Sequence, residues 1–276
     1  LLSPENTIIF DYTSDLPQMH RSSGFTQWGV VGKFPWMFGI FHAYEWENEL
    51  RGNYDLIQER LPIAAADPLC KGFVYWPENS HSDSLMLDFF TKNAWRPDTL
   101  TPEALLPEFC RDRYRAAAEP LLAAWRAALP LIKLHAALPP DFRRLASHAQ
   151  QAVTAERAAA LQADCERLSP QLQGVPELLA KLHALPVFAG DARVDRDAVD
   201  LARTAAGRLF SLVLKRHAVA QGEWQQGKAD AAAVKAAGAR CVAVLTALRD
   251  LLALHDDFSM NASMDKLQAT HPVNPC

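Results

Sequence analysis

The sequence lacks the signatures of several common classes of protein. None of its five cysteines lies in a CxxC pair or at a metal-ligand spacing, which argues against a disulfide framework and a structural metal site. It has no basic block, and its formal net charge is −4. Nothing in the composition therefore indicates a nucleic-acid or acidic-membrane partner. No apolar stretch approaches the roughly 20 residues that a membrane span needs.

Well-known catalytic motifs are also missing. There is no GxSxG elbow, no HExxH pair, no P-loop and no GxGxxG dinucleotide fingerprint. His81-Ser82-Asp83 has the letters of a catalytic triad, but adjacent residues do not adopt its geometry by that fact alone. What the chain does have is apolar content. Hydrophobic residues make up 49%, enough to bury a sizeable core.

The composition changes near residue 98. Residues 1–98 are rich in aromatics and turn residues and hold five of the seven tryptophans, whereas the chain from residue 99 is rich in Ala, Leu and Arg. Turn and cap residues between 96 and 102 mark the change. We therefore expect one domain at 1–98 and a second at 99–276.

The two regions have different periodicities. In the first, short apolar runs at 7–10, 37–41 and 72–76 lack polar alternation, as strands of a parallel sheet do when both faces are covered. Helical spacing appears at 49–61 and 84–93. Because strands and helices alternate without a GxGxxG turn, the pattern predicts an α/β unit and favours a barrel. In the second region, amphipathic patterns predict a helical domain, with helices at 102–129, 139–168, 176–185, 197–220 and 229–254.

Polar side chains follow each of the three apolar runs. Glu78 comes after a run that ends in aromatics, and Trp76 beside it could stack on a sugar. Glu78 could equally cap a backbone amide. His42 could bind a sugar hydroxyl or be a satisfied interior histidine, and Asp11 ends the first run. Because the carboxyl ends of barrel strands share one face, a common pocket is the simplest explanation for all three.

These residues resemble a known family. Phe34-Pro35-Trp36, His42, Pro77-Glu78-Asn79-Ser80 and Ala94-Trp95-Arg96 are similar to the late barrel of glycoside hydrolase family 89, the α-N-acetylglucosaminidases. Residues 199–203 and 257–264 resemble that family's helical C-terminal domain. The resemblance implies the C-terminal portion of a (β/α)8 barrel followed by an incomplete all-α domain.

The resemblance also implies an activity. Glu78 matches the nucleophile of a retaining exo-glycosidase that hydrolyses terminal α-linked N-acetylglucosamine from glycans by double displacement, and His42 matches a sugar-pocket histidine. Two carboxyl groups suffice for this chemistry, so no cofactor is expected. The family's general acid lies further before the nucleophile than this chain extends, so we expect the fragment alone to be inactive. By analogy, a periplasmic or secreted location is favoured. Further candidates for sugar binding are Trp36, Asp11, Tyr44, Glu45, Trp46, Trp76 and Asn79.

The sequence departs from the family at two places near the sugar site. Ala43-Tyr44-Glu45-Trp46 stands where the family has Asn-Phe-Gly-Gly, and Leu87 replaces a tyrosine. These changes leave open a different sugar specificity on the same scaffold. A non-catalytic carbohydrate-binding or helical interaction protein also remains an alternative.

Overall fold

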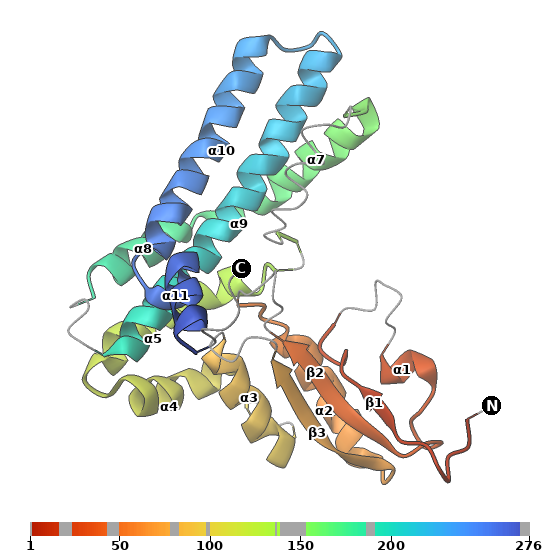
Figure 1. Cartoon of the computed structure of the whole chain (residues 1–276). Helices are drawn as coiled ribbons and strands as arrows, with labels where there is room; N and C mark the ends of the chain where they lie inside the picture. Colours follow the sequence, from red (N-terminus) through yellow and green to blue (C-terminus); the bar gives the residue numbers. More distant parts are fainter. Residues whose placement is uncertain are drawn as a thin grey trace. The chain divides into compact units, whose positions relative to one another are not determined.

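The computed structural model of the chain describes residues 2–16, 24–42, 50–77, 83–97, 100–135, 137–138, 153–185 and 191–270 (Figure 1). Of these residues, 69% are helical. The chain divides into two compact units, Leu1–Ala118 and Glu119–Cys276.

The prediction that residues 1–98 are part of a barrel is wrong. Within the described ranges there is one sheet, of three parallel strands in the order β1-β2-β3: β1 Ile9–Asp11, β2 Trp36–His42 and β3 Cys70–Pro77 (Figure 1). After β3 the described chain continues only in helices. Alternation of strand and helix predicted the parallel sheet, but it could not establish that further strands close into a barrel. The protein is mostly helical.

The helices of the first unit are α1 Phe25–Trp28, α2 Tyr54–Ala66, α3 Ser84–Trp95 and α4 Pro102–Tyr114. Side-chain caps fix where two of them begin: Asp83 accepts from the Met86 amide of α3, and Thr101 accepts from the Ala104 amide of α4. The composition changes near residue 98, yet α4 packs against α3 and belongs to the first unit.

The two faces of the sheet differ. Alternate β2 residues Trp36, Phe38 and Ile40 are completely buried, and the ring of Phe38 stacks on Phe90 of α3 at 6.3 Å. Gly39 lies on the other face of β2, where an added Cβ would be 2.7 Å from the backbone oxygen of Asp11. Successive residues of a strand point to opposite faces of the sheet. The face of Trp36, Phe38 and Ile40 is therefore the one that packs against α3, and Gly39 belongs to the opposite face.

The described residues of the second unit form helices and no strands. They are α5 Ala118–Ile132, which begins at the last residue of the first unit, and then α7 Ala155–Leu168, α8 Val175–His183, α9 Ala192–Gln225, α10 Ala231–Leu252 and α11 Met260–Thr270. Short 3-10 turns lie at Arg115–Ala117, Ser169–Leu172 and Asp256–Phe258, the first of them still in the first unit. The long helices α9 and α10 run side by side (Figure 1), around a core of Phe210, Val213, Cys241 and Leu248.

Buried charge is part of this helical packing. Arg208 of α9 is fully buried and donates to the carbonyl oxygens of Leu131 (3.2 Å), Leu138 (3.2 Å) and Ile132 (3.4 Å). These are carbonyls at and beyond the C-terminal end of α5, where the helix itself supplies no donors. Arg208 therefore closes the end of α5.

Among the residues the structure describes, α10 is long and apolar enough to cross a membrane. The expectation that no stretch reaches this length is wrong for α10. The helix meets this criterion by length and composition only, and 17% of its apolar window is buried. In this structure α10 packs along α9 through Cys241 and Leu248.

Candidate functional site

The carboxyl end of the sheet brings two predicted strand ends together. The parallel register pairs His42, the last residue of β2, with Pro77, the last residue of β3. β1 ends earlier along the sheet, because its last residue, Asp11, pairs with Phe38. After β1, Thr13 forms an isolated antiparallel bridge with Ile40 of β2. His42 and Pro77 therefore define this end of the sheet, and Glu78 is the next residue in the sequence.

Asp11 is a buried structural acceptor. One of its oxygens accepts from the amide (2.8 Å) and hydroxyl (2.7 Å) of Thr13, and the other from the Ser14 hydroxyl (3.1 Å) and the Phe25 amide (2.6 Å). An added Cβ at Gly24 would lie 2.8 Å from that second oxygen. The carboxylate thus ties the turn after β1 to the start of α1, and its hydrogen bonds lie within the protein.

His42 lies between two carboxylates. Its Nε2 is 2.7 Å from Oδ2 of Asp83, and its Nδ1 is 3.8 Å from Oδ2 of Asp15, with all three side chains fully buried. Burial by itself lowers the pKa of His42, but the two carboxylates outweigh it and raise that pKa to about 9. The ring is therefore an imidazolium at neutral pH.

Asp83 joins the end of β2 to the start of α3. Besides His42, its carboxylate accepts from the backbone amides of Met86 (3.2 Å) and Arg51 (3.4 Å). Its backbone lies in the left-handed region, with φ 55° and ψ 55°, which Asp tolerates better than most residues. Asp83 is thus a helix cap and the main counter-ion of His42.

Asp15 is less well satisfied. At 3.8 Å its contact with His42 is too long for a hydrogen bond and is electrostatic. Within the described part of the chain, neither Asp15 oxygen has a hydrogen-bond partner. Buried carboxylates are normally hydrogen-bonded, so Asp15 is an exception that asks for an explanation.

The aromatic residues before Pro77 fall on opposite faces of the sheet. Tyr75 packs near His42 (ring centroids 6.0 Å) and Phe90 on the helix-covered face, and burial followed by the charge of Asp83 raises its pKa. Trp76 points to the other face, is 51% exposed and stacks on Phe10 at 5.8 Å. The predicted common pocket is therefore divided: His42 lies on one face and Trp76 on the other.

The remaining predicted site residues lie elsewhere. Trp36 is at the amino end of β2, fully buried, stacked on Phe25 (4.6 Å) and donating its indole N–H to Asp67 (2.8 Å). It occupies the opposite end of the strand from His42. Five predicted residues fall outside the described ranges, namely Glu78, Tyr44, Glu45, Trp46 and Asn79.

Sequence reasoning did not single out Asp15 or Asp83, the two carboxylates beside His42, or the aromatic residue Tyr12, whose ring meets that of Phe41 edge-on at 5.7 Å. Asp83 carried a usable signal, because an Asp directly before an amphipathic run is a common N-cap. Asp15 carried none, since its role depends on a histidine 27 positions later in the chain. Tyr12 follows Asp11 directly and could have been noted as a further strand-end aromatic.

No metal site is found in the described residues, where no group of three or more His, Cys, Asp or Glu could hold an ion. Of the cysteines in the described residues, Cys70, Cys165 and Cys241 form no disulfide. Burial raises the pKa of Cys165 and of Cys241, which disfavours the reactive thiolate.

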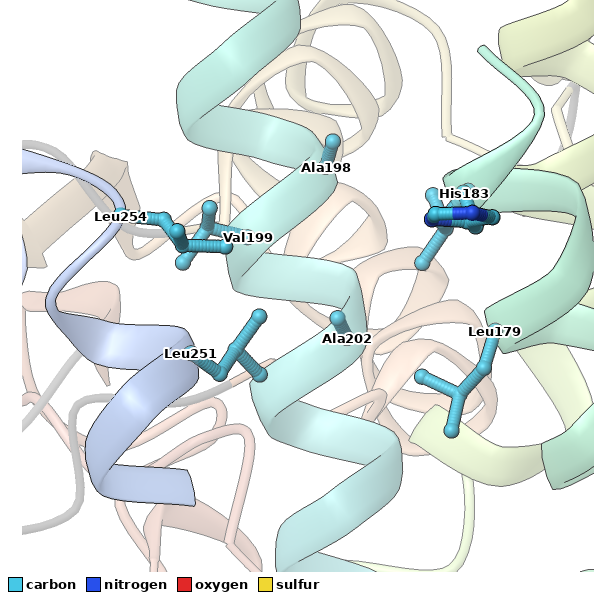
Figure 2. A pocket seen from close by; sticks show the side chains of 8 residues that line it. Leu179, His183, Ala198, Val199, Ala202, Leu251 and Leu254 are labelled. Carbon is cyan, nitrogen blue, oxygen red and sulfur yellow. The ribbon is translucent and has the colours of Figure 1, made fainter. Parts of the chain in front are cut away.

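The second unit contains an apolar cavity of about 180 Å³ between α8, α9 and α10 (Figure 2). Aliphatic side chains such as Leu179, Val199 and Leu251 line it, and His183 of α8 is the only titratable residue among the lining residues. A lone histidine among aliphatic side chains offers no pair of groups for acid–base chemistry. The candidate site is therefore the carboxyl end of the sheet, where several titratable side chains meet.

No family model matches the chain, and comparisons with curated proteins and with solved structures found no similar protein. The resemblance to glycoside hydrolase family 89 thus stays a prediction, and function must be argued from the residues themselves.

Proposed function

We propose that this chain supplies the nucleophile of a retaining exo-glycosidase that releases terminal α-linked N-acetylglucosamine, with Glu78 as that nucleophile. One observation carries the proposal: the exposed Trp76 and the strand end at Pro77 directly precede Glu78 in the sequence, at the carboxyl end of a parallel sheet. In parallel α/β units this end of the sheet is where ligands bind. The family resemblance supports the same assignment.

The reaction proceeds in two displacements. Glu78 attacks the anomeric carbon, the glycosidic C–O bond breaks, and a second carboxylic acid gives its proton to the departing oxygen. That second group, now a carboxylate, takes a proton from water as the water attacks the glycosyl ester, which frees the sugar and Glu78. Configuration at the anomeric carbon is retained.

A non-catalytic carbohydrate-binding protein is the second candidate, and one observation favours it. The described carboxylates near this end of the sheet, Asp11, Asp15 and Asp83, are completely buried. None of them is placed to protonate a leaving group in solvent-accessible space. Under the first proposal the acid is a different carboxyl group, and under the second no acid is needed.

The test is hydrolysis of 4-nitrophenyl α-N-acetylglucosaminide by the longest protein that contains this chain, in wild-type form and as Glu78→Gln. We expect the substitution to lower kcat by roughly 10⁴-fold or more, because no covalent intermediate can form. Glu59→Gln, at an exposed position on α2, is the matched control and should keep full activity.

Two further readouts separate the candidates. With Glu78→Gly, added azide should restore turnover and give the β-glycosyl azide, since the small anion takes the place of the lost carboxylate. NMR of the wild-type reaction should show the α-anomer as the first product. A folded wild-type protein that binds the sugar without turning over any α-glycoside would favour the binding protein instead.

A further inference from the structure

Four aromatic rings gather on the face of the sheet opposite His42. Trp76 stacks on Phe10 with centroids 5.8 Å apart and rings 13° from parallel, and it meets Phe41 edge-on at 6.3 Å. Tyr12 meets Phe41 edge-on at 5.7 Å and lies 6.2 Å from Phe10. Both outer rings therefore contact the same two inner rings.

The outer rings are open to solvent although they are held in place. Tyr12 is 45% exposed and Trp76 is 51% exposed, whereas Phe10 and Phe41 are partly buried between them. Each edge-on or stacked pair favours one ring orientation, so the contacts with Phe10 and Phe41 favour the arrangement in which both outer rings are exposed. Large rings that are both exposed and rigid are typical of binding sites.

The uncharged ring faces of this surface match the apolar side of a sugar ring. The four side chains carry no charge, and their ring faces are weakly negative, which suits the weakly positive C–H groups on the flat side of a pyranose. The Tyr12 hydroxyl and the Trp76 indole N–H can also hydrogen-bond sugar hydroxyls at the rim of that contact. The surface is moreover continuous along the chain with Pro77 and Glu78.

We infer that Tyr12 and Trp76, supported by Phe10 and Phe41, form a stacking subsite for a pyranose ring of the substrate. This inference rests on the proposed function and deepens it. It adds Tyr12 to the site, and it places Trp76 and Tyr12 in one aromatic surface on the face of the sheet opposite His42. The subsite recognises the apolar side of the sugar, and the chemistry at the anomeric carbon belongs to Glu78.

Binding is measured with methyl α-N-acetylglucosaminide on the Glu78→Gln protein, so that turnover does not consume the ligand. Trp76→Ala and Tyr12→Ala should each raise Kd by roughly five- to tenfold, the range expected for loss of one aromatic contact. Trp76→Phe should restore most of the affinity, which a misfolded Trp76→Ala protein would not explain. Trp95→Ala is the control, since Trp95 is 88% exposed at the end of α3 and should leave Kd unchanged.

Saturation-transfer difference NMR adds a readout of geometry. The strongest saturation should fall on the axial ring C–H protons of the sugar and should disappear in Trp76→Ala. An unchanged Kd in both alanine variants, or no sugar binding by the parent protein, would overturn the inference. So would sedimentation data in which the alanine variants lose self-association and sugar binding is absent, because the surface would then contact a second copy of the chain.

The two proposals fail in different ways. If Glu78→Gln keeps its turnover while Trp76→Ala weakens sugar binding, the nucleophile is wrong and the stacking subsite is supported. If turnover depends on Glu78 while both alanine variants bind normally, the subsite is wrong and the glycosidase is supported.

Discussion

The two units bury charge in different ways. In the second unit, the guanidinium of Arg208 donates to three backbone carbonyls at and beyond the end of α5. In the first unit, His42 faces Asp15 across 3.8 Å, and neither oxygen of Asp15 is hydrogen-bonded within the described part of the chain. The first arrangement stabilises a helix end, whereas the second holds a buried cation between two buried carboxylates at the end of a sheet.

This difference indicates where function lies. A buried charge that donates to the backbone carbonyls after a helix has a structural explanation. Two carboxylates around one imidazolium have a weaker one, and perturbed titration is characteristic of functional sites. The comparison thus favours the first unit as the location of the proposed chemistry, and the following experiments test it.

The largest expected effect is that of Arg208→Ala. It removes the guanidinium donor from three carbonyls and opens a void, which should cost roughly 3–5 kcal/mol of unfolding free energy. Leu131 and Ile132 keep a backbone donor each, so the loss of the hydrogen bond falls mainly on the carbonyl of Leu138. Hydrogen exchange should speed up in peptides of α5 and α9 and stay unchanged in β2, because the bound carbonyls all belong to the second unit. Arg249→Ala, at an exposed position on α10, should change stability by less than about 0.5 kcal/mol. Equal losses in both variants would remove the structural role assigned to Arg208.

The next effect is the pH dependence of the first unit. The pKa of His42 is raised from 6.5 to about 9 in the folded protein, so its stabilising contribution is complete below pH 6.5 and is lost as pH rises through about 9. The full difference corresponds to about 3 kcal/mol. His42→Gln should remove this slope, which is measured by urea unfolding of wild type and variant between pH 6 and pH 10. Parallel curves for the two proteins across that range would show that the carboxylates do not hold the proton on His42.

Much of the fold could be predicted from the sequence. The apolar runs at 7–10, 37–41 and 72–76 lie on or within two residues of β1, β2 and β3, because buried parallel strands need no polar alternation. Periodicity also located most of the helices, but the single helix predicted at 102–129 is wrong. It is interrupted at Arg115–Ala117, so that α4 and α5 are separate helices, and α1 and α11 were not among the predicted ranges. What failed was the step from a strand–helix alternation to a barrel, since closure depends on strands that local patterns do not reveal.

The site was harder to predict, because it depends on register. His42 and Trp76 could both be placed at strand ends, but pairing of His42 with Pro77 puts Trp76 on the opposite face. A shift of one residue in that register would have put them together. Trp36 shows the same limit: its partner Asp67 lies 31 residues away, at the amino end of the sheet.

The smallest expected effect compares two glycines of the same sheet. An added Cβ at Gly39 would lie 2.7 Å from both the Asp11 carbonyl oxygen and the Phe10 ring, whereas one at Gly72 would meet only the Met37 methyl group at 3.9 Å. Gly39→Ala should therefore cost about 1–3 kcal/mol, and Gly72→Ala should be neutral or stabilise by up to about 1 kcal/mol. Thermal unfolding of the two variants measures the difference. Because the crowded ring is that of Phe10, Gly39→Ala should also weaken sugar binding at Trp76, whereas Gly72→Ala should not. Equal behaviour of the two glycines would mean that the close approach of β1 to β2 does not hold the aromatic surface in place.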